Sequence, residues 1–307
     1  MVAYLFAGQG SQYVGMGKDL YEAFPESKEI FVKADRALGF SLSKLCFEGP
    51  LEELTQTQNC QPAIVTVTIA AFRAFTANRV PRTVDYVAGL SLGEYSALVA
   101  AEAISFEDVI RLVRRRGELM EEDARMRPGS MAAVIGLDIE ALKAVCKEAN
   151  VEIANLNCPG QVVISGGKNE IKVAEKLATE KGAKRVIILE TSGAFHSSFM
   201  RDAALKLGKE LEKIKVSDPR IPLVSNVNAQ PVSGKEEIKD NLVKQVTSSV
   251  LWEDSMKFIL SKGITNYIEF GPGKVLKGLM RKIEPAAEVK TIEKAQDISD
   301  PAPSQQI

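Results

Sequence analysis

Two short apolar segments in the first third of the chain each end in a glycine-rich loop. Residues 2–7 lead into the loop at 8–10, and residues 84–88 lead into the loop at 89–93. Short apolar runs bounded by glycine predict buried strands. A helix is expected over residues 94–101, directly after the second loop. This alternation of strand, loop and helix predicts an α/β domain with a mainly parallel sheet.

A periodic segment that begins just after Ser105 predicts a long helix. Ser105 is its N-cap, and Asp108 three residues further on is the capping-box partner. Apolar residues recur at helical spacing, in a stripe made of Val109, Leu112, Val113, Leu119 and Met120. Arg116 lies inside that stripe, whereas Arg114 and Arg115 point elsewhere. The pattern therefore places one arginine on the buried face of the helix.

The middle of the chain has a different pattern. Its predicted elements follow the order β-α-β-β-α-β, with strands over 131–137, 151–155, 162–165 and 185–189 and helices over 139–149 and 170–181. That order is typical of a ferredoxin-like module. Further strands are expected at 221–225 and 267–270, and a polar, mobile tail over 296–307. We therefore predict a large α/β subdomain (residues 1–127 and 193–307) with a small ferredoxin-like subdomain (residues 128–192) inserted into it.

Composition narrows the chemistry that this chain of 307 residues can perform. Lys and Arg together number 39 against 40 Asp and Glu, which argues against a chain-wide role in binding polyanions. His196 is the only histidine, so a zinc site built on several imidazoles is excluded. The four cysteines have no metal-ligand spacing and suit a reducing compartment as buried thiols. No uncharged apolar run approaches the roughly 18 residues that span a bilayer, and the N-terminus lacks the charged leader of a signal peptide.

The loop at residues 89–93 has the Gly-x-Ser-x-Gly pattern of a nucleophile elbow. Its position between a predicted strand and a predicted helix is the context that this motif requires. The two glycines allow a sharp turn that raises the hydroxyl of Ser91 out of the sheet. The N-terminus of the following helix favours the negative charge that builds on a carbonyl oxygen under attack. Ser91 is therefore the candidate nucleophile.

A serine hydroxyl is a poor nucleophile until a base takes its proton. His196 is the only imidazole available, and it lies in a loop of small residues after the last strand of the small module. No acidic residue stands out as the third member of a triad. The alternative is a Ser-His dyad in which a backbone carbonyl orients the ring.

Residues 8–12 form a second glycine-rich loop, after the first strand. It lacks the GxxxxGK[ST] spacing of a phosphate-binding loop. In an α/β fold, loops at the carboxyl ends of neighbouring strands gather around one crevice. We therefore expect Gln9 beside Ser91, where its amide would form an oxyanion hole together with the backbone N–H of Leu92.

Arg116 has two interpretations. A buried arginine needs a partner, because an isolated buried charge is very unfavourable. One interpretation is an internal ion pair with a Glu or Asp. The other is a guanidinium that holds a substrate carboxylate through two parallel hydrogen bonds.

Together these residues resemble the malonyl-CoA:acyl carrier protein transacylase family, the acyltransferases of type II fatty acid and polyketide synthesis. The resemblance covers nearly the whole chain and rests on short motifs at residues 6–12 (FAGQGSQ), 61–63 (QPA), 89–95 (GLSLGEY), 116–117 (RG), 157–161 (NCPGQ), 194–197 (AFHS) and 271–276 (GPGKVL). The family fold implies a hydrolase-like α/β core with a ferredoxin-like insertion, which matches the organisation described above.

The resemblance also implies a role for each candidate residue. Ser91 would be the nucleophile and His196 the base. The Gln9 side chain and the Leu92 backbone would form the oxyanion hole. Arg116 would bind the malonyl carboxylate, which favours the second interpretation of this residue.

Three positions bear on the subtype within the family. Phe195 precedes the catalytic histidine, as in malonyl-specific members, where methylmalonyl enzymes have serine. Leu90 and Ala7 depart from the usual His and Pro; that His is not the catalytic base, so activity is not in doubt. Leucine in the elbow is associated with plastid-type members. The expected location is a bacterial cytoplasm or, alternatively, the plastid stroma after removal of a transit peptide.

The expected activity is transfer of malonyl from malonyl-CoA to the phosphopantetheine thiol of an acyl carrier protein, through a malonyl-serine, for fatty acid synthesis. We expect a monomer that needs no metal or cofactor and binds neither nucleic acid nor membrane. The alternatives are a serine acyl hydrolase or thioesterase, a trans-acting polyketide acyltransferase, and a non-catalytic scaffold. A basic rim for the acidic carrier has the candidates Arg114, Arg115, Lys274, Lys277, Arg281 and Lys282.

Overall fold

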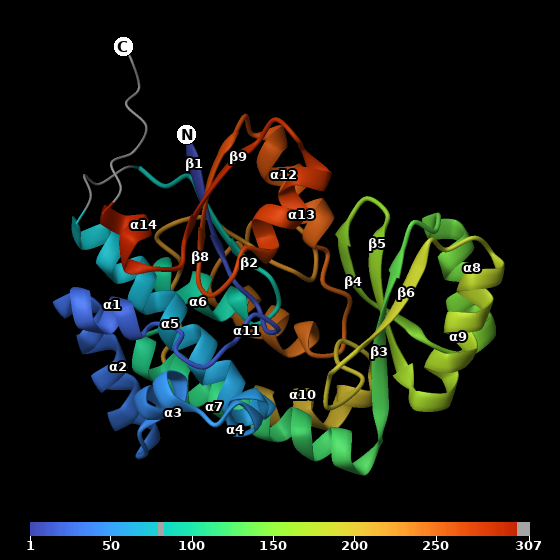
Figure 1. Ribbon diagram of the computed structural model, residues 1–307, viewed down its shortest axis with the longest axis horizontal. Helices are drawn as coiled ribbons and strands as arrows, with labels where there is room; N and C mark the ends of the chain where they lie inside the picture. The colour runs from blue at the N-terminus through green and yellow to red at the C-terminus, as the bar shows by residue number, and fades with distance from the viewer. Residues whose placement is uncertain (79–82, 300–307) are drawn as a thin grey trace.

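The computed structural model describes residues 1–78 and 83–299, and its larger unit is built on a parallel sheet (Figure 1). The strand order is β7-β2-β1-β8-β9, and every neighbouring pair runs parallel. These strands are β1 (Val2–Phe6), β2 (Tyr86–Gly89), β7 (Leu223–Val224), β8 (Asn266–Phe270) and β9 (Glu288–Ile292). The predicted α/β architecture with a parallel sheet is confirmed.

Helices cover both faces of this sheet, because β1 carries apolar side chains on both of its faces. Val2, Tyr4 and Phe6 pack in the large core with the helices of the N-terminal half, whereas Ala3 and Leu5 pack in a second core with the C-terminal helices. The N-terminal helices are α1 (Lys18–Ala23), α2 (Pro25–Leu38), α3 (Leu42–Glu48), α4 (Leu51–Thr55), α5 (Thr57–Asn78), α6 (Gly93–Ala100) and α7 (Phe106–Met126). The later ones are η1 (Ser198–Met200), α10 (Arg201–Leu211), α11 (Lys235–Gln245), α12 (Trp252–Ser261), α13 (Val275–Ile283) and α14 (Ala295–Ser299).

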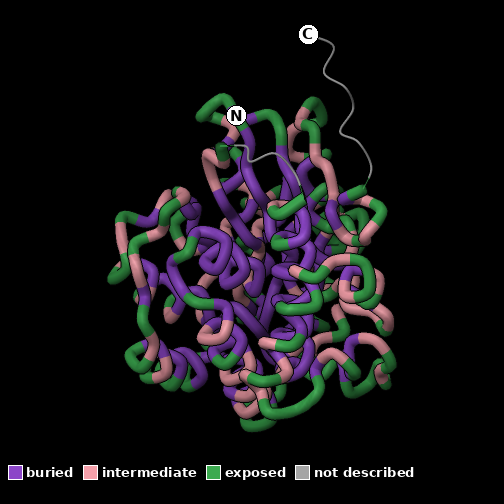
Figure 2. The backbone as a smooth tube through the Cα atoms, turned by 90° about the vertical axis from the view of Figure 1, so that its left-hand side faces the viewer, coloured by how far each residue is buried: buried purple, intermediate pink, exposed green. Residues whose placement is uncertain are grey.

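Helix α5 lies at the centre of the large core. By length and composition it is the single helix among the described residues that could cross a membrane, but 83% of its most apolar window is buried inside the protein. Figure 2 shows that buried residues run through the middle of the fold and that exposed residues lie at its periphery. The apolar character of α5 therefore follows from its place in the core.

The smaller unit has a four-stranded antiparallel sheet in the order β4-β5-β3-β6. Its strands are β3 (Gly129–Ile135), β4 (Glu152–Cys158), β5 (Gln161–Gly167) and β6 (Arg185–Leu189), and its helices are α8 (Ile139–Ala149) and α9 (Lys168–Glu180). Figure 1 shows both helices on the outer face of the sheet, away from the larger unit. The predicted order of elements is confirmed. The chain crosses between the units after α7 and after β6, and the division at residues 128 and 192 stays a prediction.

Two sequence-based expectations differ from the structure. The expected mobile tail begins too early, because residues 295–299 form α14 and bury Ile298; residues 300–307 lie outside the described part of the chain. The strand expected at 221–225 is only Leu223–Val224 long. Pro222 precedes it, and proline has no backbone N–H to donate to a sheet.

Candidate active site

The turn between β2 and α6 presents Ser91 at the carboxyl edge of the parallel sheet. β1 and β2 are neighbours in register, with Phe6 opposite Gly89. Ser91 has a φ of 51°, in the left-handed region. A Cβ on Gly89 would lie 2.0 Å from the carbonyl carbon of Gly93, and one on Gly93 would lie 2.1 Å from the Phe6 oxygen. Only glycine fits at either place, which explains both glycines of the Gly-x-Ser-x-Gly pattern.

His196 lies directly against this serine. The Oγ of Ser91 is 2.8 Å from Nε2 of His196, and Nδ1 of the same ring is 2.8 Å from the backbone oxygen of Gln245. Gln245 is the last residue of α11, where carbonyl oxygens have no partner within the helix. A carbonyl only accepts, so Nδ1 carries the hydrogen and Nε2 presents its lone pair to the hydroxyl.

The surroundings of His196 keep its ring neutral. Burial lowers the pKa of His196 to about 4, and the positive charge of Arg116 acts in the same direction. A ring with this pKa is uncharged at neutral pH and can accept a proton from Ser91.

Arg116 faces inward from α7, as its place in the apolar stripe predicts, and only 2% of its surface is exposed. Its Nη2 is 3.2 Å from Oε1 of Gln245 and 3.4 Å from Oγ of Ser91. The guanidinium carbon lies 5.4 Å from the centre of the Tyr95 ring. Across residues 1–78 and 83–299, Nε of Arg116 has no hydrogen-bond partner and no carboxylate oxygen lies within 4.0 Å of its guanidinium. The direct internal ion pair is therefore absent from the described chain.

The loop after β1 lies against the elbow. A Cβ on Gly8 would be only 2.5 Å from the backbone oxygen of Leu90, so the two loops touch. Gln9 follows at the rim, half-buried. Leu92 is the N-cap of α6, so its N–H lies at the helix end where backbone donors are unpaired within the helix. The structure thus brings Gln9 and Leu92 to the same edge as Ser91, and their oxyanion-hole role stays a prediction.

Asn226 is a site residue that the sequence analysis missed. Its Oδ1 accepts from the backbone N–H of Ser91 at 2.7 Å, and its Nδ2 donates to the backbone oxygen of Gly89 at 2.8 Å. These two bonds hold the elbow from the side of β7. The residue directly follows the strand expected at 221–225, and the rule that loops gather at carboxyl strand ends could have found it.

Glu94 and the side chain of Gln245 were also missed. Oε2 of Glu94 accepts from Nε2 of Gln245 at 2.7 Å and from the backbone N–H of Asn226 at 3.2 Å. Nε2 of Gln245 additionally donates to the backbone oxygen of Ser91 at 3.1 Å. Burial raises the pKa of Glu94 to about 7, and the hydrogen bonds from Gln245 and Asn226 oppose that shift.

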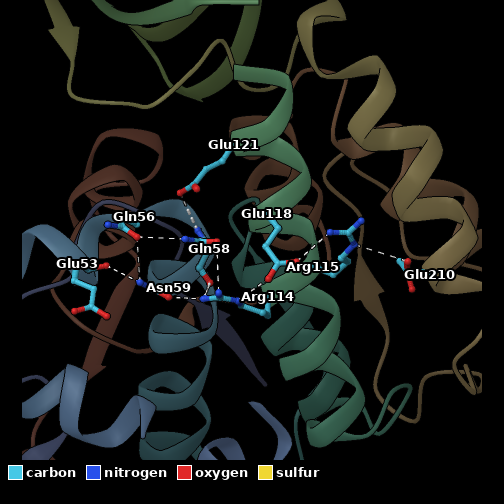
Figure 3. Close-up of polar contacts among 9 residues, drawn as sticks. All are labelled: Glu53, Gln56, Gln58, Asn59, Arg114, Arg115, Glu118, Glu121 and Glu210. Atoms are coloured by element: carbon cyan, nitrogen blue, oxygen red, sulfur yellow. Dashed lines mark hydrogen bonds and ion pairs between the residues drawn. The ribbon is translucent and has the colours of Figure 1, made fainter. Parts of the chain in front are cut away.

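Arg114 and Arg115 lie on the outer side of α7 in a charged network (Figure 3). Arg114 pairs with Glu118 at 2.9 Å and contacts Asn59 at the start of α5. Arg115 pairs with Glu118 at 3.1 Å and with Glu210 at 3.9 Å. Both side chains thus have partners within the protein, which weakens their candidacy for a carrier-binding rim. The remaining candidates lie on α13 or at its N-cap, and their docking role stays a prediction.

The four cysteines are buried and unpaired. Burial raises the pKa of Cys60 to about 12, so this thiol stays protonated. In the described ranges, no three His, Cys, Asp or Glu side chains are grouped as metal ligands would be.

Known proteins with similar sequences and structures identify the family of this chain. Residues 3–299 match the family described as acyl transferase domain. The chain is 48% identical over 305 residues to the malonyl CoA-acyl carrier protein transacylase of Bacillus subtilis (strain 168). The matched region covers 98% of this chain and 94% of the relative. A protein of the same name from Staphylococcus aureus (strain MRSA252) is 40% identical over 96% of each chain.

The chain belongs to the malonyl CoA-acyl carrier protein transacylase family. Solved structures of transacylases have the same fold. The acyl-carrier-protein S-malonyltransferase of Bartonella henselae superimposes with a TM-score of 0.94 at 40% identity, over 97% of each chain. A malonyl-transacylase in complex with its type II PKS acyl-carrier protein also gives a TM-score of 0.94, at 38% identity over 97% of each chain.

Proposed function

We propose that this chain transfers a malonyl group from malonyl-CoA to the phosphopantetheine thiol of an acyl carrier protein, as an acyl-carrier-protein S-malonyltransferase of fatty acid synthesis. Full-length relatives with this activity in their names support the proposal. One observation in the structure carries it further. A buried guanidinium with an unpartnered Nε lies 3.4 Å from the hydroxyl of the candidate nucleophile, and the described residues place no carboxylate beside it. This arrangement supports a carboxylated acyl group as the substrate.

The first half-reaction forms an ester on Ser91. Nε2 of His196 takes the hydroxyl proton as Oγ attacks the thioester carbonyl of malonyl-CoA. The carbonyl oxygen becomes negative, and the Gln9 amide and Leu92 N–H stabilise it. When the C–S bond breaks, the CoA sulfur takes the proton from His196 and leaves as a thiol.

The second half-reaction reverses these roles. His196 takes the proton of the phosphopantetheine thiol, whose sulfur attacks the ester carbonyl. The C–O bond then breaks, and the proton returns to Oγ of Ser91. The backbone carbonyl of Gln245 orients the His196 ring in both half-reactions. It takes the place of the acidic residue of a catalytic triad, so Ser91 and His196 form a dyad.

Arg116 has two tasks in this reaction. It selects a carboxylated acyl group over a neutral one, because only the former gains charge-assisted hydrogen bonds from the guanidinium. It also fixes the distal end of the acyl group, so that the ester carbonyl is held in place for attack by the carrier thiol. A hydrolase for neutral acyl groups would gain nothing from this buried cation.

We further propose the finer features of the fold and setting. The βαββαβ order and the strand order β4-β5-β3-β6 support a ferredoxin-like small subdomain, and the strand-turn-helix around Ser91 supports a hydrolase-like core. Serine and histidine supply the nucleophile and the base, and the transfer changes no oxidation state. The reaction therefore needs neither a metal nor a redox cofactor. A monomer in a bacterial cytoplasm, or alternatively in the plastid stroma, is the expected setting.

Intact-mass spectrometry of the protein with malonyl-CoA, with and without holo-carrier, tests the proposal. A stable malonyl adduct that only the carrier discharges is the expected result. Rapid release of malonate without the carrier would establish a hydrolase instead. The absence of any adduct would establish a non-catalytic protein and overturn the proposal.

A further inference from the structure

The charge of Arg116 is balanced at a distance. Gln245 lies between Arg116 and Glu94: its Oε1 accepts from Nη2 of Arg116 at 3.2 Å, and its Nε2 donates to Oε2 of Glu94 at 2.7 Å. We propose that Glu94 is a positioning residue that supplies the counter-charge of Arg116 across the Gln245 amide, and so sets how strongly the site prefers a carboxylated acyl group. This inference rests on the proposed function, in which Arg116 binds the malonyl carboxylate.

The placement of Glu94 compensates the charge of Arg116 and still leaves hydrogen-bond donors of Arg116 open for the substrate. All three side chains are at least 98% buried, so an uncompensated guanidinium would be unfavourable. A carboxylate in direct contact would neutralise it but would also occupy the hydrogen-bond donors that the substrate needs. With an amide between the two charges, Arg116 keeps its Nε without a partner in the described chain while a negative charge remains near.

Oε2 of Glu94 binds both residues that position Ser91 and His196, namely Asn226 and Gln245. Oε2 of Glu94 accepts from the Asn226 backbone as well as from Gln245. Asn226 holds the backbone of Ser91, and Gln245 holds the ring of His196. Glu94 therefore has a charge role toward Arg116 and a geometric role toward both catalytic residues.

Two substitutions separate these roles. Both hydrogen bonds end on one oxygen, so Glu94→Gln can keep them with its amide oxygen while it removes the charge. Glu94→Ala removes the charge and both bonds. The first variant is expected to change selectivity, whereas the second is expected to lower acylation by every acyl-CoA.

The decisive measurement is the ratio of the dissociation constants of acetyl-CoA and malonyl-CoA, determined by calorimetry in a Ser91→Ala background that cannot be acylated. The two ligands share their nucleotide, so the ratio isolates the acyl carboxylate. At about pH 8, Glu94→Gln leaves Arg116 with less compensation, and the preference for malonyl-CoA should rise by roughly three- to tenfold.

A pH series tests the same claim without a change at Glu94. Among the described residues, the ionisable groups that act on Glu94 are Arg116 on α7 and Tyr95 beside it on α6, while His196 lies near Arg116. Arg116 stays charged, and His196 and Tyr95 stay neutral between about pH 6 and pH 8, because burial moves their pKa values to about 4 and about 12. Glu94, with a pKa raised to about 7, ionises in this range. The malonyl preference should therefore fall from about pH 6 to about pH 8, and Glu94→Gln should abolish that fall.

Glu269→Gln is the matched control. Glu269 on β8 is also buried with a pKa raised to about 7, but its carboxylate accepts from the backbone N–H groups of Leu276 and Lys277 in α13. Its substitution should leave the ratio unchanged, and an equal rise in this control would overturn the inference.

The remaining outcomes are distinguishable. If the Ser91→Ala protein shows no malonyl preference, the proposed function fails. If it shows a preference that Glu94→Gln leaves unchanged or lowers, only the counter-charge role fails. If Glu94→Gln does not fold, the pH series on the Ser91→Ala protein decides, and a flat series contradicts the inference.

Discussion

The two sides of helix α7 show how differently one residue type can be used. Arg114, Arg115 and Arg116 are consecutive, but the first two lie in an outer network with Glu118 and Glu210, drawn in Figure 3. Arg116 lies in the interior beside Ser91, against an amide and an aromatic ring. The outer arginines have carboxylate partners, whereas the inner one has none within contact distance in the described chain.

Burial and incomplete pairing, more than charge alone, therefore mark a binding group. An exposed ion pair is weak because water screens it and because ordering two long side chains is unfavourable. A buried cation with an open donor gains much more from a ligand that completes its hydrogen bonds. The interior should therefore respond strongly to single substitutions, and the outer network only weakly.

The largest effect is expected from His196→Ala. Without the base, Ser91 keeps its proton, and acylation by malonyl-CoA should slow by about 10²–10⁴-fold. Rapid-quench measurement of CoA release gives this rate. A near-normal burst would remove His196 from the reaction and reduce the interior site to a binding pocket.

Arg116→Met comes next and tests the comparison itself. It keeps much of the side-chain volume and removes the charge, so the malonyl transition state should lose about 2–5 kcal/mol of stabilisation, which is a roughly 30- to 4000-fold fall in kcat/KM for malonyl-CoA. Acetyl transfer should be unchanged or faster. An equal loss for both acyl groups would show that Arg116 is merely structural.

Asn226→Ala should have an intermediate effect. It leaves the backbone groups of Ser91 and Gly89 without their partner, and the free energy of unfolding should fall by about 1–3 kcal/mol. Acylation should slow by roughly tenfold as the elbow loosens, which urea titration and acylation kinetics measure together. Asn228→Ala is the control, since the hydrogen bonds of this nearby side chain within the described residues go to Glu237 and to the Gln230 backbone. An equal loss in the control would contradict the role of Asn226.

The smallest effect is expected from Arg115→Met on the outer side of α7. The free energy of unfolding should change by at most about 1 kcal/mol, because the ion pairs of Arg115 are partly exposed to water, which screens them. The malonyl-to-acetyl ratio in the acylation step should match that of the unsubstituted protein. A clear loss of malonyl preference would show that the two sides of the helix are not as separate as described.

The local features of the fold could be predicted from the sequence. Strands β1 and β2 and the helix after the second loop follow from short apolar runs and glycines, and the inward Arg116 follows from the period of its own helix. Each of these signals lies within one segment. Ser91, His196 and Arg116 could therefore be proposed from the sequence as nucleophile, base and carboxylate-binding residue, and the structure brings their side chains together.

The contacts that could not be predicted join residues far apart in the sequence. Asn226 and Gln245 reach the site from 135 and 49 residues away from their partners Ser91 and His196. In Gln245 the acceptor is a backbone oxygen, which any residue type would supply. Helix α5 is buried on nearly all sides, so it has no polar stripe from which a helical period could be recognised.

Mapping of the acylated residue tests the central claim most directly. After brief mixing with radiolabelled malonyl-CoA and acid quenching, the label is expected on the peptide that contains Ser91. Ser91→Ala, which should fold normally, is expected to carry no label. Label that persists in Ser91→Ala, or that maps to another peptide in the unsubstituted protein, would rule out Ser91 as the acylated residue.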